Sequence, residues 1–333
     1  MGKQVLLFFS ICSLLFIGNF VIPSLMNPYL FLILAYCGIN IIMGVSLNII
    51  NGITGQFSIG HAGFMAVGGY VSAAVSFYFF APILNSLPSD TSLLFWVYQN
   101  GLFVASLLLG GGAAALFGTL VGLPSLHLRG DYLGIVTLGF GEIIRVLILN
   151  LDFVGGARGF TGIPPWSNFF WIYFFVVAVV MVSFRLLRSY HGRALLSIRE
   201  DEIAAESIGI PITRYKVKAF VLSSFFAGIA GGLFAHCIGQ LDPSSFTFNK
   251  SFEAIIIVVL GGMGSISGSV VAAIITTILP KALIPLQEFT KTDFRMVIYP
   301  LLLLTLMLTR PQGLFGNKEL SDVLPFLKRK NIS

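Results

Sequence analysis

The most polar stretch of this sequence lies between residues 188 and 218, where charged side chains interrupt an otherwise apolar chain. Ser197 and Glu200 have the spacing of a capping box, Gly209 suits the position just after a helix, and Pro211 follows where a helix cannot continue. Between charged residues, apolar side chains recur at helical spacing: Leu195, Ile198, Ala205 and Ile208. The pattern predicts one short amphipathic helix with defined ends.

Two roles are open to such a helix: it lies on a membrane surface, or it docks on a partner protein. Helices that lie on membranes usually carry Lys and Arg on the polar face, whereas acidic residues prevail here. Because carboxylates gain nothing from an anionic leaflet, the sequence favours docking on a protein. The candidate docking residues are Ser197, Arg199, Glu200, Asp201, Ala204, Ala205, Glu206 and Gly209.

A second set of candidates consists of polar residues and glycines inside apolar runs. Ionisable groups at membrane depth are costly and usually face a bundle interior or a pathway. Glu142 and Arg145 are three residues apart and can pair on one helix face, which favours a structural bridge near the outer interface. His236 and Glu253 flank a turn and are expected to be solvated helix ends. The candidates for a pathway or a helix break are Asn48, Asn51, Gln56, His61, Glu142, Arg145, Gly261, Gly262 and Gly264.

Motifs for catalysis are missing from the sequence. There is no G-x-x-x-x-G-K-[ST] to cradle a phosphate, no H-E-x-x-H and no G-x-S-x-G. The three cysteines, Cys12, Cys37 and Cys237, all lie in apolar runs and form no metal-binding or disulfide pattern. We therefore expect no enzyme activity, no metal and no cofactor in this chain.

The composition indicates that lipid is the main solvent of the chain. Only 10% of residues are charged and the mean hydropathy is +0.92, whereas soluble domains carry about 25% charged residues. The net charge is +6, and the basic residues lie in short loops between apolar runs, as membrane topology requires. The sequence has no stripe of basic residues with interleaved aromatics, so nucleic acid is not expected as a partner.

Apolar runs of roughly 20 residues, the length that crosses a bilayer, predict an all-α polytopic membrane protein. The apolar run near the N-terminus is long for a signal peptide and lacks a small-x-small site, so it is interpreted as the first span. The run at 252–263 is short, and with the next it forms either two crossings or a broken, re-entrant helix. The ten candidates are 4–22, 29–50, 59–80, 101–123, 131–150, 168–187, 217–239, 252–263, 266–285 and 294–309.

The distribution of Lys and Arg favours cytoplasmic termini and ten crossings. With that topology the loop 188–216 is cytoplasmic, and most of the 20 basic residues lie inside. The basic residues left outside are Arg158, Lys250, Lys281, Lys291 and Arg295.

Several segments resemble the branched-chain amino acid permeases of ABC importers (LivM type), which are similar to urea permeases of the same superfamily. Ala204, Ala205 and Gly209 resemble the EAA-x-x-x-G coupling loop of such permeases, although Ile203 stands where the family has Glu. The wider resemblance runs from the second predicted span to the C-terminus. Its segments are NGITGQFSIGHAGF (51–64), LRGDYLGIVTLGFGEIIR (128–145), IREDEIAAESIG (198–209), VVLGGMGSISG (258–268) and RPQGLF (310–315).

The resemblance implies a single permease domain over residues 1–333 with the ten-helix, type II importer fold of the vitamin B12 and ribose permeases. It implies a cytoplasmic coupling loop at 188–216 and a place in the bacterial inner membrane. The implied partners are a second permease subunit, two ATP-binding subunits and a periplasmic substrate-binding protein, with lipid around the spans. Branched-chain amino acids are the implied substrates, and ATP hydrolysis belongs to the partner chains.

Two alternatives remain open from the sequence. A urea or short-amide ABC permease keeps the class and changes the substrate. An ion-coupled secondary transporter also uses helices broken by glycine, but it needs acidic coupling residues deep in the membrane. Glu142 and Glu253 are expected near span ends, which favours the ABC permease.

Overall fold

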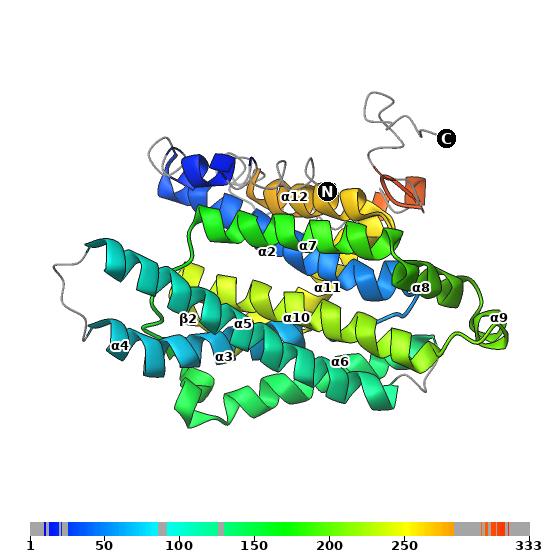
Figure 1. Ribbon diagram of the computed structural model, residues 1–333, viewed down its shortest axis with the longest axis horizontal. Coiled ribbons are helices and arrows are strands. Elements are labelled where there is room, and N and C mark those ends of the chain that lie inside the picture. Colours follow the sequence, from blue (N-terminus) through cyan, green and yellow to red (C-terminus); the bar gives the residue numbers. More distant parts are fainter. Residues whose placement is uncertain are drawn as a thin grey trace.

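The computed structural model describes residues 10, 13–19, 21, 26–85, 92–125, 130–282, 301, 304, 305, 308–310, 312–316 and 319. This part of the chain is almost entirely helical and forms an elongated bundle (Figure 1). Its long helices are α2 (Pro28–Asn48), α3 (His61–Val75), α5 (Ser92–Ser125), α6 (Asp131–Leu149), α7 (Phe169–Arg188) and α10 (Ile212–Ile238). Its other helices are α4 (Ala81–Asn85), α8 (Tyr190–Glu200), α9 (Glu202–Ser207), α11 (Phe248–Gly261) and α12 (Ile266–Ala282). Two π-helical segments, Ile49–Ile53 and Ser76–Phe80, extend α2 and α3, and 3-10 turns lie at Asp152–Val154, Gly156–Arg158 and Pro243–Phe246.

Six helices among the described residues are long and apolar enough to cross a membrane. They confirm six of the predicted spans within a few residues at most boundaries. The predicted spans 4–22 and 294–309 lie largely outside the described residues. The six helices are Pro28–Ile53, His61–Leu84, Phe95–Leu123, Tyr132–Leu149, Phe169–Arg188 and Ile212–Ile238.

The centre of the bundle is α10, which packs against α2, α3 and α5. Glycines allow this close approach. A Cβ atom on Gly68 of α3 would lie 2.1 Å from the Cα of Gly228 on α10, and one on Gly110 of α5 would lie 2.5 Å from the carbonyl oxygen of Gly68. Small residues at such crossings let helix backbones pack directly, as is usual in membranes.

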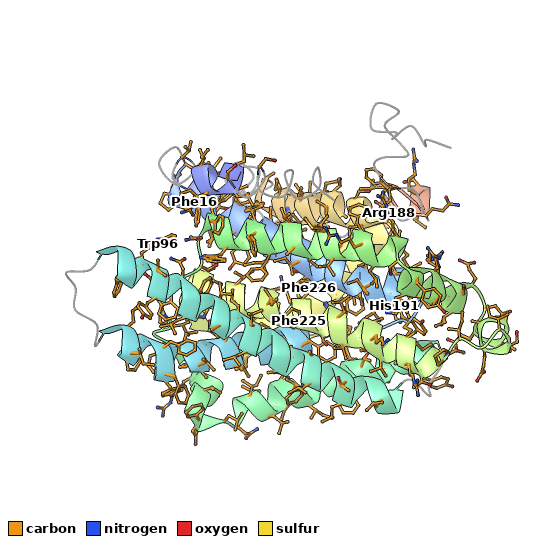
Figure 2. All side chains as sticks on the ribbon, in the orientation of Figure 1. Phe16, Trp96, Arg188, His191, Phe225 and Phe226 are labelled. Atoms are coloured by element: carbon orange, nitrogen blue, oxygen red, sulfur yellow. The ribbon has the colours of Figure 1, made fainter. Side chains whose placement is uncertain are left out.

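The two ends of the bundle differ. At one end, α8 and α9 project beyond the long helices (Figure 1), and Figure 2 shows Arg188 and His191 there, with Phe16 and Trp96 toward the opposite end. The connections at that opposite end are joined by β1 (Phe160–Thr161) and β2 (Gln240–Leu241), which pair antiparallel with Phe160 opposite Leu241.

The eighth and ninth predicted spans are the shorter helices α11, of 14 residues, and α12, of 17 residues. Gly262 and Gly264 join them in a turn with φ of 106° and 96°, a conformation that favours glycine. Next to this turn the two helix backbones are in contact at Gly261 and Gly268. A Cβ atom on Gly261 would lie only 2.5 Å from the carbonyl carbon of Gly268. Among the described residues, this hairpin is thus two helices joined at the predicted glycines.

The described residues of the 310–315 segment complete the hairpin. The amides of Leu314 and Phe315 donate to the carbonyls of Leu260 and Gly261, at 2.8 and 3.2 Å. These are among the last carbonyls of α11, which have no partner within the helix. The segment therefore acts as a cap that comes from a distant part of the chain.

A candidate coupling site between two glycine breaks

The segment 197–209 is not one helix but the end of α8 and the whole of α9. Asp201 begins α9: its Oδ1 accepts hydrogen bonds from the amides of Ile203 and Ala204, at 2.8 and 3.1 Å. The predicted cap, Ser197, lies inside α8 and donates to the carbonyl of Arg193. The capping-box prediction was wrong because Asp201, an equally good N-cap, stands within a run of acidic residues that hides it.

The predicted end of this segment is confirmed at Gly209, which has φ of 84°. The amide of Gly209 donates to Glu206 and the amide of Ile210 donates to Ala205, the two bonds of a Schellman motif. Ile208 was expected on the buried face, but its side chain is 73% exposed. The helix ends before Ile208 can turn toward the bundle.

The inner face of α8 and α9 is anchored to the bundle. Leu195, Ile198 and Ala205 are buried in one cluster with Ile49 and Ile53, the π-helical end of the first described span. An ion pair between the buried Lys216 of α10 and the partly exposed Glu202 of α9 adds a polar link. The helical projection is therefore fixed to both α2 and α10.

Arg199 connects this projection to both glycine breaks. Its Nη1 donates to the carbonyl oxygen of Gly52 at 3.1 Å, and its Nη2 pairs with Glu200 at 2.8 Å. A Cβ atom on Gly264 would lie only 3.0 Å from the same Nη1. The guanidinium thus sits between the break that follows α2 and the turn between α11 and α12.

Asn48 joins the two breaks directly. Its side-chain amide donates to Ser265 and accepts from the backbone amide of Gly264, both at 2.9 Å. A Cβ atom on Gly52 would lie 1.8 Å from the Oδ1 of Asn48 and 2.3 Å from the nitrogen of Gly264. Glycine is therefore required at position 52 for the two segments to touch.

A stretch without regular secondary structure, residues 54–60, follows the first break and leads into α3. The Asn51 side chain holds it by bonding both the carbonyl and the amide of Ser58, at 3.2 and 3.1 Å. His61 then begins α3 with its Nε2 2.8 Å from the Oγ of Ser46. Gln56 is buried, and among the described residues its side chain has no hydrogen-bond partner. Asn48, Asn51 and His61, predicted near the first break, thus form hydrogen bonds that hold this region together, whereas Gln56 forms none among the described residues.

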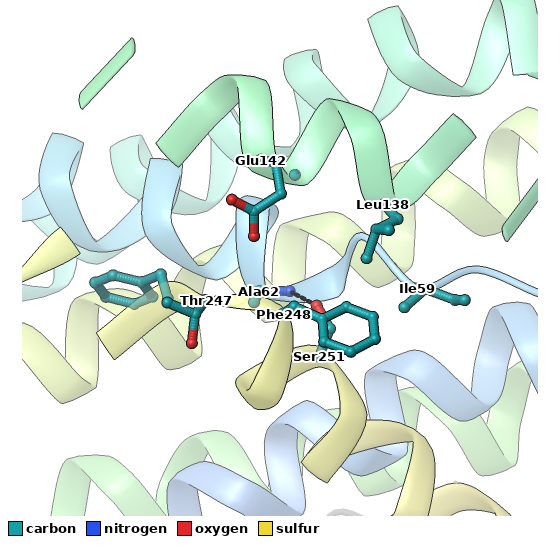
Figure 3. Close-up of a pocket in the computed structure, with 10 residues that line it drawn as sticks. Ile59, Ala62, Leu138, Glu142, Thr247, Phe248 and Ser251 are labelled. Carbon is teal, nitrogen blue, oxygen red and sulfur yellow. Dashed lines mark hydrogen bonds between the residues drawn. The ribbon is translucent and has the colours of Figure 1, made fainter. Parts of the chain in front are cut away.

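Glu142 and Arg145 form the predicted pair, at 2.7 Å. Glu142 lies near the middle of α6. Its side chain points toward the start of α3, where the amide of Ala62 donates a hydrogen bond to Ser251 (Figure 3). The cavity that it lines is about 10 Å³, room for one water molecule at most. The pair was expected toward a span end, and it takes no part in the contact around Arg199.

The prediction that His236 is a solvated helix end was wrong. His236 is fully buried, and its Nδ1 lies 2.8 Å from the carbonyl oxygen of Pro164. The ring of Trp166 stacks on it with centroids 5.8 Å apart. The 155–165 loop folds over the end of α10 and removes His236 from solvent. This tertiary contact is not visible in the sequence pattern.

The outward side of α8 and α9 is open. A groove of about 450 Å³ lies between them, and residues such as Ser197, Glu200 and Ala204 line it. Beside it Ile203 is 70% exposed. Exposed apolar side chains with a polar rim mark an interaction surface.

Within the described ranges, no group of three or more His, Cys, Asp or Glu residues could hold a metal ion.

Long apolar helices with a helical projection at one end are the features of a polytopic membrane protein. The family described as "Branched-chain amino acid transport system / permease component" matches residues 29–307. The chain belongs to this family, as the resemblance predicted.

Named relatives agree with the family. The branched-chain amino acid permease protein LivM of Salmonella typhimurium is 37% identical over 83% of this chain and 67% of its own length. LivM of Escherichia coli K12 is also 37% identical, over 88% of this chain and 70% of its own length. The permease protein LivH of Salmonella typhimurium is 29% identical over 51% of this chain and 54% of its own. No solved structure shows a significant match. The relatives are transport subunits and not enzymes, which confirms the prediction of a subunit without catalysis of its own.

Proposed function

We propose that this chain is the LivM-like permease subunit of an ABC importer that moves branched-chain amino acids across the inner membrane. The family match over residues 29–307 supports the permease role. The observation that carries the mechanism is Arg199, which binds Gly52 and borders Gly264 from the projecting helix α8. A projection that only lay on a membrane would not need this link to the bundle interior.

The partners follow from the two surfaces and from the relatives. An ATP-binding subunit docks on the groove between α8 and α9, where Ile203 supplies an apolar contact. A LivH-like permease forms a heterodimer with this chain, because LivM and LivH carry the name of the same high-affinity transport system. Two ATP-binding subunits and a periplasmic binding protein complete the importer.

The coupling mechanism uses the contacts around Arg199. When ATP closes the cytoplasmic subunits, α8 and α9 move together because they share one buried cluster with Ile53. Arg199 transmits the displacement to the break at Gly52, and Asn48 transmits it to the turn at Gly264. The two glycine breaks then shift as a unit and switch the bundle between outward and inward access.

The topology that we propose places α8, α9 and both termini in the cytoplasm, with ten crossings of type II importer form and a single permease domain. The basic side chains near the projecting end support this orientation: Arg185, Arg188, Arg193, Arg199 and Arg214.

The test is uptake of labelled leucine and of urea into cells with and without this gene, each with ATP depleted and then restored. We expect loss of ATP-dependent leucine uptake on deletion, with urea uptake unchanged. Loss of urea uptake alone would keep the class and change the substrate. Uptake that a protonophore abolishes at constant ATP would contradict the proposal and favour the ion-coupled alternative.

A further inference from the structure

Charged side chains of α11 and α12 lie half-way along the first described span. Asn40 is roughly 18 Å from the start of a span of 26 residues, at 1.5 Å per residue. The ammonium of Lys250 donates to the Oδ1 of Asn40 at 3.1 Å. Lys250 and Lys281 were expected on the outer side and Glu253 at a solvated helix end; the side chain of Glu253 is 54% exposed. Ionisable groups at such depth usually mark a pathway.

These groups share one cavity between α2, α11 and α12. It has a volume of about 350 Å³, within the range of small-molecule sites. The polar residues that line it are Tyr36, Asn40, Lys250, Glu253, Thr276, Thr277 and Lys281. We call it the mid-depth cavity. Ile257 adds an apolar wall.

The charges in the mid-depth cavity do not balance. Lys250 pairs with Glu253 at 2.8 Å. Lys281 lies 4.5 Å from the centre of the Tyr36 ring, a cation–π contact that leaves its positive charge uncompensated. Within the part of the chain that the structure describes, Lys281 forms no ion pair. The described residues that line the cavity therefore carry a net charge of +1, and they include a carboxylate that is partly exposed.

The other polar groups are already bonded. Asn40 donates to the Oγ1 of Thr277 at 2.9 Å and accepts from Lys250. Thr277 in turn donates to the carbonyl of Ala273 at 2.7 Å. This network holds Lys250 in place and leaves Lys281 and Glu253 as the groups best placed to meet a ligand.

We propose that the mid-depth cavity binds a free α-amino acid during its passage. The α-carboxylate of the ligand faces Lys281, its ammonium faces Glu253, and its aliphatic side chain lies against Ile257. The α-carboxylate gives Lys281 the anionic partner that it lacks among the described residues, and the ammonium shares Glu253 with Lys250. A neutral molecule such as urea leaves Lys281 without an anionic partner. The inference rests on the proposed function for the substrate class and adds a binding step within this chain.

The test compares Lys281→Gln with wild type in the complete importer, reconstituted in proteoliposomes with its partner subunits and binding protein. ATP-driven uptake of labelled leucine and the rate of ATP hydrolysis are measured in parallel. We expect uptake per ATP hydrolysed to fall about tenfold, the effect of losing one charge-assisted hydrogen bond. Glu253→Gln should fall similarly, and the matched control Lys218→Gln, an exposed lysine outside the cavity, should resemble wild type.

The outcomes separate this inference from the proposed function. Unchanged leucine uptake in Lys281→Gln, with an active wild type, would overturn the cavity as an amino acid site. If the wild type carries another amino acid, the proposed substrate changes and the same loss is expected with that amino acid. Uptake of urea alone by the wild type would overturn both.

A second measurement does not depend on transport by the variant. Thr276, which also lines the cavity, is replaced by cysteine after Cys12, Cys37 and Cys237 are changed to serine. We expect an anionic methanethiosulfonate to react faster than a cationic one, leucine to slow the reaction, and Lys281→Gln to remove the preference for the anion. Equal rates for both reagents without leucine protection would contradict the proposal.

Discussion

At the scale of the residue, Arg199 is the side chain on which the proposed coupling depends. Its guanidinium reaches the carbonyl of Gly52 from a helix that lies 147 positions further along the chain. A planar guanidinium with several donors can bind a carbonyl and a carboxylate at the same time. Arg199 does so with Gly52 and Glu200, so it ties α8 to the first break.

We predict that Arg199→Ala separates ATP hydrolysis from transport. With the link to Gly52 removed, movement of α8 no longer reaches the glycine breaks, so leucine uptake per ATP should fall about tenfold. The measurement is uptake and hydrolysis in proteoliposomes. Arg193→Ala, on an exposed position of the same helix, is the matched control. Equal transport ratios in both variants would exclude the role that we assign to Arg199.

Gly52→Ala tests the contact between the two breaks. The added methyl group would overlap Asn48 and the backbone of Gly264, and overpacking of this kind costs about 3 kcal/mol. We expect a lower melting temperature of the purified complex and loss of uptake. Gly112→Ala is the control, because a Cβ atom there meets nothing within 4 Å. If Gly52→Ala melts like Gly112→Ala, the breaks do not touch as described.

At the scale of the element, the start of α9 shows how a cap positions the proposed docking surface. Asp201 holds the first amides of a six-residue helix, which is too short to be stable alone. We predict that Asp201→Ala costs about 1 kcal/mol of local stability and speeds hydrogen exchange in α9. Ser197→Ala, at the position first expected to be the cap, should change exchange in α9 little. The reverse order of effects would restore the capping-box interpretation.

The hairpin of α11 and α12 is the element whose position the sequence could not predict. An apolar run at 252–263 predicts a span, and the glycines predict its break, but neither shows at which depth it begins. The position of this hairpin along α2 depends on tertiary contacts such as that of Lys250 with Asn40, 210 residues away. Similarly, Asn48 and Ser265 are 217 residues apart. The two glycine breaks could therefore be recognised in the sequence, but their contact with each other could not be predicted.

At the scale of the whole molecule, the sequence predicted most of what depends on hydropathy and charge. Six spans are confirmed near their expected boundaries, because each is a long apolar run with turn formers at its ends. The projecting segment 188–216 was also found, since its charges interrupt those runs. The errors at Ser197 and His236 arise where tertiary contacts, rather than local pattern, decide which polar group is bonded.

The central claim is that α8 and α9 dock on an ATP-binding subunit, and site-specific photo-crosslinking tests it most directly. A photoreactive residue is placed at Ile203 on α9 or, as a control, at Phe153, which is 59% exposed in a connection at the opposite end. We predict a crosslink from position 203 to the ATP-binding subunit and none from position 153. A crosslink to that subunit from position 153 but not from 203 would contradict both the coupling role of α9 and the proposed orientation.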